Sequence, residues 1–446
     1  MTSTFRNRLI SEQVQAVNSG AISRVDLAQA VRTDIERYEE QLQAWVMLQT
    51  LEEPEATEST SASASTEPQP LAGISIGVKD IIDVAGLPTR SGSAITSAEP
   101  VLEDASCVAR FKELGAVVQG KTVTTEFGYF SPGPTRNPWE HNHSPGGSSS
   151  GSAAAVGANT IQIALGTQTA GSLTRPASFC GAAGMVLAPG STPMQGIHGL
   201  SKTLDSLGIL TRTTDDLDTV YSAFVGIAPS PEPEVEPADI FLWDGSDILP
   251  LAPQMQGLLT ELPRLCEQLE LGTAPLNWSD HVLTLTEDHR TVMGYEAAHT
   301  MASTMTEHKD ELSPQLQELL TNGAAISSQD YEEALIRRKC SRESLKRLLG
   351  ETGIIIGPAA AGPAPEFSTG TGSPDLSRAW QLLGLPTVTV PGAKTTSGLP
   401  LGIQLVSLPG SEKRLLNLAR RLEALLRRVH SLSETLESPT LKDLTW

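Results

Sequence analysis

The chain has 446 residues, of which 39% are hydrophobic and 4% aromatic, and its formal net charge is −20 at pH 7. These residues suffice for a sizeable core, whereas no Lys/Arg-rich block is present to bind nucleic-acid phosphates or an anionic membrane surface. No apolar h-region follows the N-terminus, and proline and glycine interrupt every apolar run well short of a membrane span. We therefore expect a soluble, cytoplasmic protein with no direct nucleic-acid partner and no membrane partner.

The four cysteines, Cys107, Cys180, Cys266 and Cys340, lie far apart in the sequence. Their spacing excludes CxxC metal or redox motifs and provides no disulfide framework for a small domain. We expect reduced cysteines that pack as small apolar side chains.

The first half of the chain combines helical and strand-like segments. Apolar residues recur at helical spacing within residues 5–50, which predicts two helices. Residues 52–70 are rich in Ser, Thr, Glu and Pro and have almost nothing to bury, so we expect an exposed loop there. The next segments are short, and we expect strands at 71–78, 116–119 and 160–165 and a short helix at 152–158.

The second half begins after a Pro/Glu-rich stretch at 228–237, which is the best linker candidate. Residues 240–350 are expected to be mostly helical, with a polar face rich in Glu, Arg and Lys. Strand character returns at 354–356, 387–390 and 401–406, and an amphipathic helix is expected at 411–428. This alternation of strands and helices predicts an α/β fold with a largely covered sheet.

Two Gly/Ser-rich turns, 146–151 and 170–172, carry the most information about chemistry. Glycine lets backbone N–H groups approach a ligand closely, and a serine beside such a turn is a candidate nucleophile. The candidates Ser148 and Ser172 are 24 residues apart. Ser149 is the centre of a G-x-S-x-G pattern, but that motif requires a strand directly before it, and turn-forming residues precede it here. Gly/Ser clusters are also common in plain flexible loops.

The second turn has the more specific context. The strand expected at 160–165 runs directly into residues 166–172. A tight turn after a strand can aim consecutive N–H groups at one point, which is the geometry of an oxyanion hole. No Lys-Ser/Thr pair follows the glycines, as a phosphate-binding loop would require. The candidate oxyanion-hole donors are the N–H groups of Thr169, Ala170, Gly171 and Ser172.

A serine nucleophile needs a base to take its proton. His141 and His143 are the only histidines near the turns, and no cysteine or carboxylate cluster accompanies them, so we expect rim-forming loop residues rather than metal ligands. A lysine can serve instead, because burial lowers its pKa and a neutral amine accepts a proton. Lys79 and Lys121 each follow an apolar run, and each could equally extend to solvent. The residues alone do not choose between them.

Three segments together resemble the amidase signature family of Ser–Ser–Lys amide hydrolases. They read GVKDIIDVAGLPTRSGS, PGGSSSGSAAAV and GTQTAGSLTRPASFCG, and the similarity continues over roughly residues 5–430. The resemblance implies a central mixed β-sheet covered by helices on both faces, with no metal or organic cofactor. It implies one domain over 1–446, with a signature core at 71–227, a substrate-pocket region at 240–350 and a return to the core at 354–430.

The resemblance also assigns roles position by position. It implies that Lys79 is the base, that Ser172 is the nucleophile, and that Ser148 bridges them after a cis Gly147–Ser148 peptide bond. The candidate catalytic residues are therefore Lys79, Ser148 and Ser172, and this choice favours Lys79 over Lys121.

Three positions depart from the family pattern. The family commonly has Asp where Gln168 stands, Gly where Ala170 stands, and Arg one position before Arg175. Both serines and the lysine are retained, so the departures indicate a subfamily variant rather than a disabled site.

The resemblance implies an enzyme that hydrolyses a small-molecule carboxamide to a carboxylate and ammonia or amine, through an acyl-enzyme on Ser172. The alternative is the glutamine-hydrolysing component of a tRNA-dependent amidotransferase; the altered turn and the weak match over 290–380 speak against it. A non-catalytic binding protein with the same fold would be expected to have lost a member of the triad. A homodimer is compatible with all these observations.

Overall fold

The computed structural model describes residues 7–51, 69–230 and 238–433. Most of the expected exposed loop at 52–70 and most of the linker candidate at 228–237 lie outside these ranges. None of the helices in the described ranges combines the length and the hydropathy needed to cross a bilayer.

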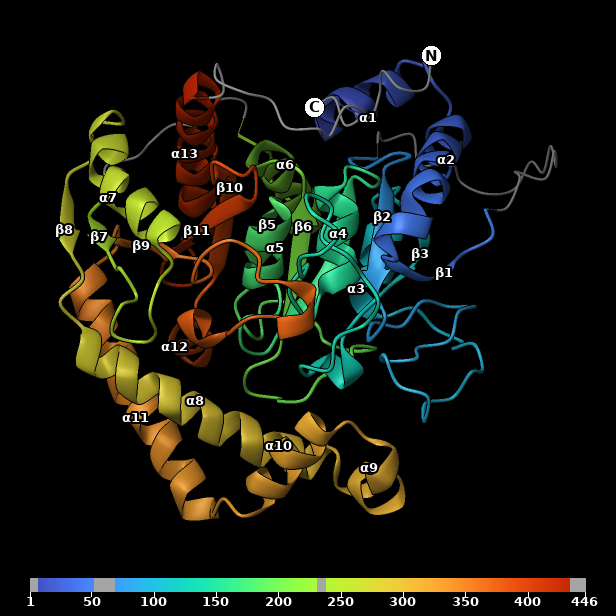
Figure 1. Cartoon of the computed structure of the whole chain (residues 1–446). Helices are drawn as coiled ribbons and strands as arrows, with labels where there is room; N and C mark the ends of the chain where they lie inside the picture. Colours follow the sequence, from blue (N-terminus) through green and yellow to red (C-terminus); the bar gives the residue numbers. More distant parts are fainter. Residues whose placement is uncertain (1–6, 52–68, 231–237, 434–446) are drawn as a thin grey trace.

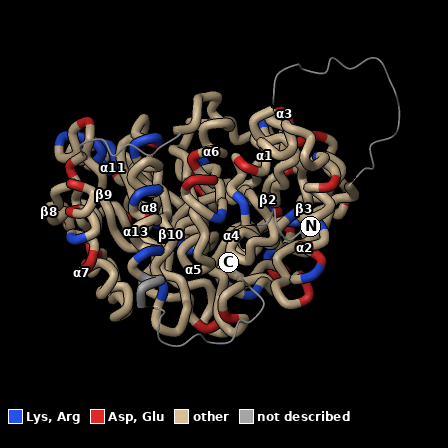
Figure 2. The backbone as a smooth tube through the Cα atoms, turned by 90° about the horizontal axis from the view of Figure 1, so that it is seen from above, with Lys and Arg blue, Asp and Glu red and all other residues tan. Residues whose placement is uncertain are grey.

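One sheet of eleven strands extends across the described molecule, in the order β1-β3-β2-β4-β6-β5-β10-β11-β9-β7-β8 (Figures 1 and 2). Strand β2 runs parallel to β3 and β4, and β7 runs parallel to β8 and β9, whereas the strands between are antiparallel. The sheet is therefore mixed. The strands are β1 (Trp45–Leu48), β2 (Ser75–Lys79), β3 (Val117–Thr122), β4 (Ile163–Gln168), β5 (Ala183–Val186), β6 (Ser206–Thr211), β7 (Ile240–Leu242), β8 (Thr273–Pro275), β9 (Ile354–Pro358), β10 (Thr387–Lys394) and β11 (Pro400–Val406).

Helices cover both faces of this sheet. Side chains alternate between the faces of a strand, and in β4 Ile163 and Leu165 join one apolar cluster with α3, α6 and α13, while Ala164 joins a second cluster with α2, α4 and α5. The helices are α1 (Ile10–Asn18), α2 (Arg24–Leu42), α3 (Ser106–Glu113), α4 (Ser150–Gly157), α5 (Thr174–Cys180), α6 (Thr214–Val225), α7 (Pro253–Glu267), α8 (Ser279–Thr300), α9 (Ala302–Glu307), α10 (Pro314–Ala324), α11 (Ser328–Leu349), α12 (Asp375–Leu383) and α13 (Glu412–Ser433).

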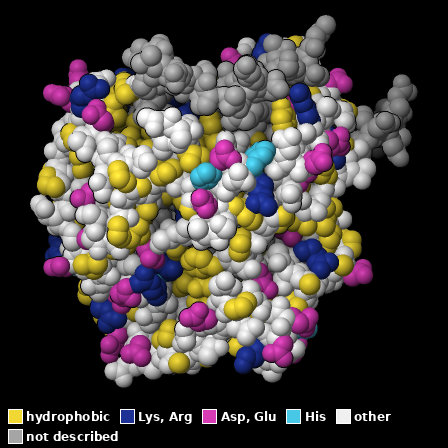
Figure 3. Space-filling model, viewed as in Figure 1, with side chains coloured by type: hydrophobic (Ala, Val, Ile, Leu, Met, Phe, Trp, Pro, Cys, Tyr) yellow, Lys and Arg dark blue, Asp and Glu magenta, His cyan; other side chains and the backbone are white. Residues whose placement is uncertain are grey.

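The segment 240–350 is mostly helical, as the sequence predicts, but it contributes the short strands β7 and β8 to one edge of the sheet. Its long helices α8 and α11 pack together and extend below the sheet in Figure 1. Helix α8 also packs on α12, which carries residues of the site described below. Figure 3 shows that acidic and basic side chains are interspersed over the face seen in Figure 1.

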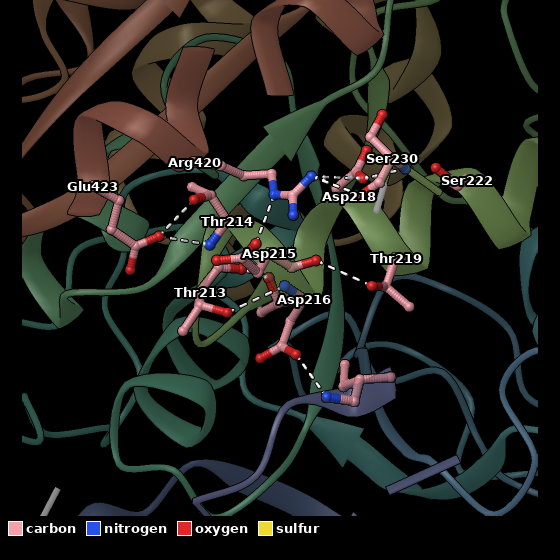
Figure 4. Close-up of polar contacts among 12 residues, drawn as sticks. Thr213, Thr214, Asp215, Asp216, Asp218, Thr219, Ser222, Ser230, Arg420 and Glu423 are labelled. Atoms are coloured by element: carbon pink, nitrogen blue, oxygen red, sulfur yellow. Dashed lines mark hydrogen bonds and ion pairs between the residues drawn. The ribbon is translucent and has the colours of Figure 1, made fainter. Parts of the chain in front are cut away.

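A polar cluster joins α1, α6 and α13 behind the sheet (Figure 4). The Glu423 carboxylate of α13 accepts hydrogen bonds from the N–H and the hydroxyl of Thr214, at 2.7 and 2.6 Å. Asp216 accepts from the N–H of Ile10 at 2.7 Å. The first turn of α6 is thereby capped by side chains distant in sequence. The cluster also contains ion pairs of Arg420 with Asp215 and Asp218.

Candidate active site

Lys79 is the last residue of β2 and is fully buried. Its Nζ donates to Ser148 Oγ at 2.6 Å and to Thr167 Oγ1 at 2.7 Å. Burial lowers the pKa of Lys79 to about 7, and the Asp205 charge opposes that shift only in part. A substantial fraction of this amine is therefore neutral near pH 7, and a neutral amine can accept a proton.

Ser148 follows a cis peptide bond, Gly147–Ser148, and precedes α4. Helix α4 approaches the end of β3 so closely that a Cβ on Gly151 would lie 2.2 Å from the carbonyl oxygen of Ala44. Only glycine fits there. Arg175 Nη2 donates to the Gly147 carbonyl at 2.5 Å, which fixes the peptide that carries Ser148.

Ser172 lies in the turn between β4 and α5. The side-chain oxygen of Gln168 accepts from the N–H groups of Leu173 and Thr174, both at 3.0 Å, so an amide at this position can hold the turn as a carboxylate would. The structure thus gives Gln168, one of the three departures, a defined partner set. Within the described residues, no hydrogen bond is formed by the N–H groups of Thr169, Ala170, Gly171 and Ser172.

Both serines line one cavity of about 360 Å³. Thr169 and Ala170 also line it, whereas Gly171 is not among the lining residues. Its apolar wall includes Phe130, Leu200 and Met293, and Met293 is the contribution of the helical segment 240–350. The cavity is lined in addition by Arg175 and Arg378.

His289 of α8 is a site residue that the sequence did not indicate. It is fully buried, its Nε2 donates to the Thr169 carbonyl at 2.8 Å, and its Nδ1 accepts from Arg378 Nη1 at 2.9 Å. A carbonyl oxygen only accepts, so the proton resides on Nε2. Burial lowers the pKa of His289 well below its ordinary value, which keeps the ring neutral.

Asp205 holds the same turn from another side. Its Oδ1 accepts from Thr169 Oγ1 at 2.5 Å and its Oδ2 accepts from the Ser201 N–H at 2.9 Å. Burial raises the pKa of Asp205 to about 6. No motif identified in the sequence pointed to this residue or to His289, because each meets Thr169 only through tertiary packing.

The other candidates lie elsewhere. Ser149 is fully buried with its hydroxyl 3.3 Å from the Thr167 carbonyl, and it does not line the cavity. Lys121 forms a buried ion pair with Asp80 at 2.9 Å. His143 pairs with Glu366 through an isolated bridge. In the part of the chain that the structure describes, His, Cys, Asp and Glu side chains form no group of three that could hold a metal ion.

Comparison with known proteins gives consistent matches. Residues 26–241 match the sequence model of a family described as Amidase. The protein named "Putative amidase AmiA2" from Mycobacterium tuberculosis is 32% identical over 413 residues, which cover 83% of each chain. The amidase-like component of the glutamyl-tRNA(Gln) amidotransferase from Carboxydothermus hydrogenoformans is 29% identical, covering 92% of this chain and 96% of that protein.

Solved structures agree with the sequence matches. A crystal structure described as an amidase superposes with a TM-score of 0.82 at 27% identity, covering 94% of this chain and all of that one. The sheet, its helical layers and the lysine–serine contact thus stand beside a relative above 30% identity over most of the chain. The chain belongs to the amidase signature family of amide-hydrolysing enzymes.

Proposed function

We propose that the chain hydrolyses a small carboxamide through an acyl-enzyme on Ser172, with Lys79 as the base and Ser148 as the relay. The observation that carries this proposal is the contact between Lys79 Nζ and Ser148 Oγ, because it joins a buried amine of lowered pKa to a cavity that Ser172 also lines. A base must lie within hydrogen-bond reach of the proton that it removes, directly or through a relay.

In the proposed reaction, Ser172 Oγ attacks the amide carbon while its proton passes to Ser148 and the Ser148 proton passes to neutral Lys79. The carbonyl oxygen becomes an oxyanion that accepts from N–H groups of the turn 169–172. When the C–N bond breaks, the leaving nitrogen takes the proton back through Ser148. Water then attacks the ester carbon by the same route and releases the carboxylate.

The turn has support that suits this role. His289 donates to the Thr169 carbonyl, and that carbonyl belongs to the same peptide as the N–H of Ala170. Hydrogen bonds in a chain polarise one another, so the histidine would strengthen Ala170 as an oxyanion donor. Asp205 fixes the Thr169 side chain at the other side of the turn.

A serine-directed fluorophosphonate tests the nucleophile. We expect it to label Ser172 in the wild-type protein, and Ser172→Ala to lose both the label and the release of ammonia from a panel of amides. Ser149→Ala is the matched control, since Ser149 is an adjacent buried serine outside the cavity. Undiminished turnover in Ser172→Ala would contradict the assignment.

A second candidate is the glutamine-hydrolysing component of a tRNA-dependent amidotransferase, because the glutamyl-tRNA(Gln) amidotransferase relative matches over most of both chains. Such a component would pass ammonia to a partner protein. Co-expression with candidate partner proteins and an assay for glutamine hydrolysis separate the two. Stable complex formation together with glutamine-specific turnover would favour the second candidate.

A further inference from the structure

The charge of the active-site cavity is opposite to that of the chain. The protein carries a formal net charge of −20, yet the residues that line the cavity include two arginines and, among those described, no aspartate or glutamate. A buried cationic wall without a matching acid is costly unless a ligand supplies the negative charge.

Arg175 is buried and lacks a carboxylate partner among the described residues. Its Nη1 donates to the Gly372 carbonyl at 2.8 Å and its Nη2 donates to the Gly147 carbonyl at 2.5 Å. Neutral carbonyl oxygens orient the guanidinium but do not neutralise it. Its Nε is buried and has no hydrogen-bond partner in the described structure.

Arg378 is held at the cavity wall from behind. Its Nε donates to Asp375 at 2.6 Å and its Nη1 donates to His289, so its Nη2 is left without a hydrogen bond among the described residues. Asp375 does not fully compensate this charge, because it also pairs with Arg290 at 3.0 Å. The two cavity arginines are close enough that the charge of Arg378 lowers the pKa of Arg175.

We propose that Arg175 and Arg378 bind a carboxylate on the substrate, so that the substrate is the monoamide of a small dicarboxylic acid. This inference rests on the proposed amidase function. The planar guanidinium fork matches a carboxylate, and Phe130, Leu200 and Met293 provide an apolar wall for the methylene chain between the carboxylate and the amide.

The same argument disfavours free glutamine. Its α-carboxylate would suit the arginines, but its α-ammonium would lie beside them in a cavity whose described lining offers no acidic side chain. A like charge placed near a buried cation is destabilising. The cavity therefore favours an acyl group with one negative charge and no positive charge.

Three amides of equal length test this inference by calorimetric binding to Ser172→Ala, which does not require turnover. Glutaramate carries only the carboxylate, L-glutamine adds the ammonium, and pentanamide has a methyl group in place of the carboxylate. We expect glutaramate to bind at least about 10-fold more tightly than either of the others, because a hydrogen-bonded charge pair is gained.

The advantage of glutaramate should disappear in Ser172→Ala/Arg378→Met. It should persist in Ser172→Ala/Arg290→Met, which removes a positive charge beside the same Asp375 but outside the cavity. Equal binding of glutaramate and pentanamide, or no binding of glutaramate, would overturn the inference. Release of ammonia by Ser172→Ala would instead contradict the proposed nucleophile, so the two failures are distinguishable.

Discussion

Two lysines on neighbouring parallel strands show what distinguishes a structural buried cation from a candidate base. In the register of β2 and β3, Lys79 pairs with Thr122 while Lys121 pairs with Val78, so the two side chains lie on opposite faces of the sheet. Both are fully buried. Lys121 contacts the Asp80 carboxylate at 2.9 Å, whereas Lys79 contacts only hydroxyl oxygens. Burial is therefore common to both, and the partner makes the difference.

The largest effect is expected from Lys79→Met. This variant keeps the volume of the buried side chain and removes the amine, so kcat/KM should fall about 10²- to 10⁴-fold, as is typical when a general base is lost. The melting temperature should be maintained, because no buried carboxylate loses an ion-pair partner. Amide hydrolysis and thermal unfolding measured on the same sample check both parts. Retained turnover would show that Lys79 is not the base.

Lys121→Met should give the reverse result. It leaves Asp80 buried without its cation, and breaking a buried pair destabilises a protein by about 3–5 kcal/mol. Below its melting temperature the variant should still hydrolyse amides. Denaturant unfolding gives the stability, and Lys121→Met/Asp80→Asn is the control that should recover much of it. An inactive but stable Lys121→Met would reverse the assignment of the two lysines.

The pH dependence should separate the lysines further. Only neutral Lys79 accepts a proton, so kcat/KM should fall as the pH drops below about 7, its pKa in the folded protein. Lys121→Met should keep this acid limb. Asp205, whose pKa is about 6, also titrates nearby, so Asp205→Asn must be measured as well. If the acid limb disappears in Asp205→Asn, it belongs to the carboxyl group instead of the amine.

The stability of the folded protein should follow the same pKa. Between about 7 and 10.5 the unfolded chain holds the Lys79 proton and the folded chain has lost it, so the free energy of unfolding rises with pH. Lys79→Met should remove this contribution. Denaturant unfolding at pH 7 and pH 9 measures the difference, and equal slopes in the two proteins would contradict the lowered pKa.

The smallest effect is expected from Thr167→Val. It removes one of the two hydroxyls beside Lys79, and a single hydrogen bond of about 1 kcal/mol corresponds to roughly a 5-fold change in kcat/KM. Ser149→Ala, which also removes a hydroxyl near Thr167, should cost stability but leave kcat/KM unchanged. Equal loss of rate in both variants would mean that general packing, rather than the contact with Lys79, sets the effect.

Sequence patterns predicted the long or strongly apolar elements. Every residue of β2 is buried, as in a strand covered on both faces, and such apolar runs are visible in the sequence. The three-residue strands β7 and β8 are too short to show a period, and they join the sheet only through their pairing with β9 and with each other. The expected strand at 160–165 starts later, at Ile163.

The site was predictable only where its residues lie in the family segments. Physical reasoning could not choose between the lysines, since the carboxylate that neutralises Lys121 is adjacent in sequence to Lys79 and faces the other way. His289 and Arg378 belong to α8 and α12, more than 100 residues from Thr169, and reach the turn only through helix packing. No local pattern carries that information.

The polar cluster at the start of α6 has a consequence for synthesis on the ribosome. The Glu423 carboxylate is made 209 residues after the Thr214 N–H that it binds, and α13 also packs on β10. Until α13 emerges, α6 lacks this cap and β10 lacks its cover. Nascent chains stalled before residue 412 should therefore remain sensitive to protease, and the domain should acquire resistance late, when translation has passed α13.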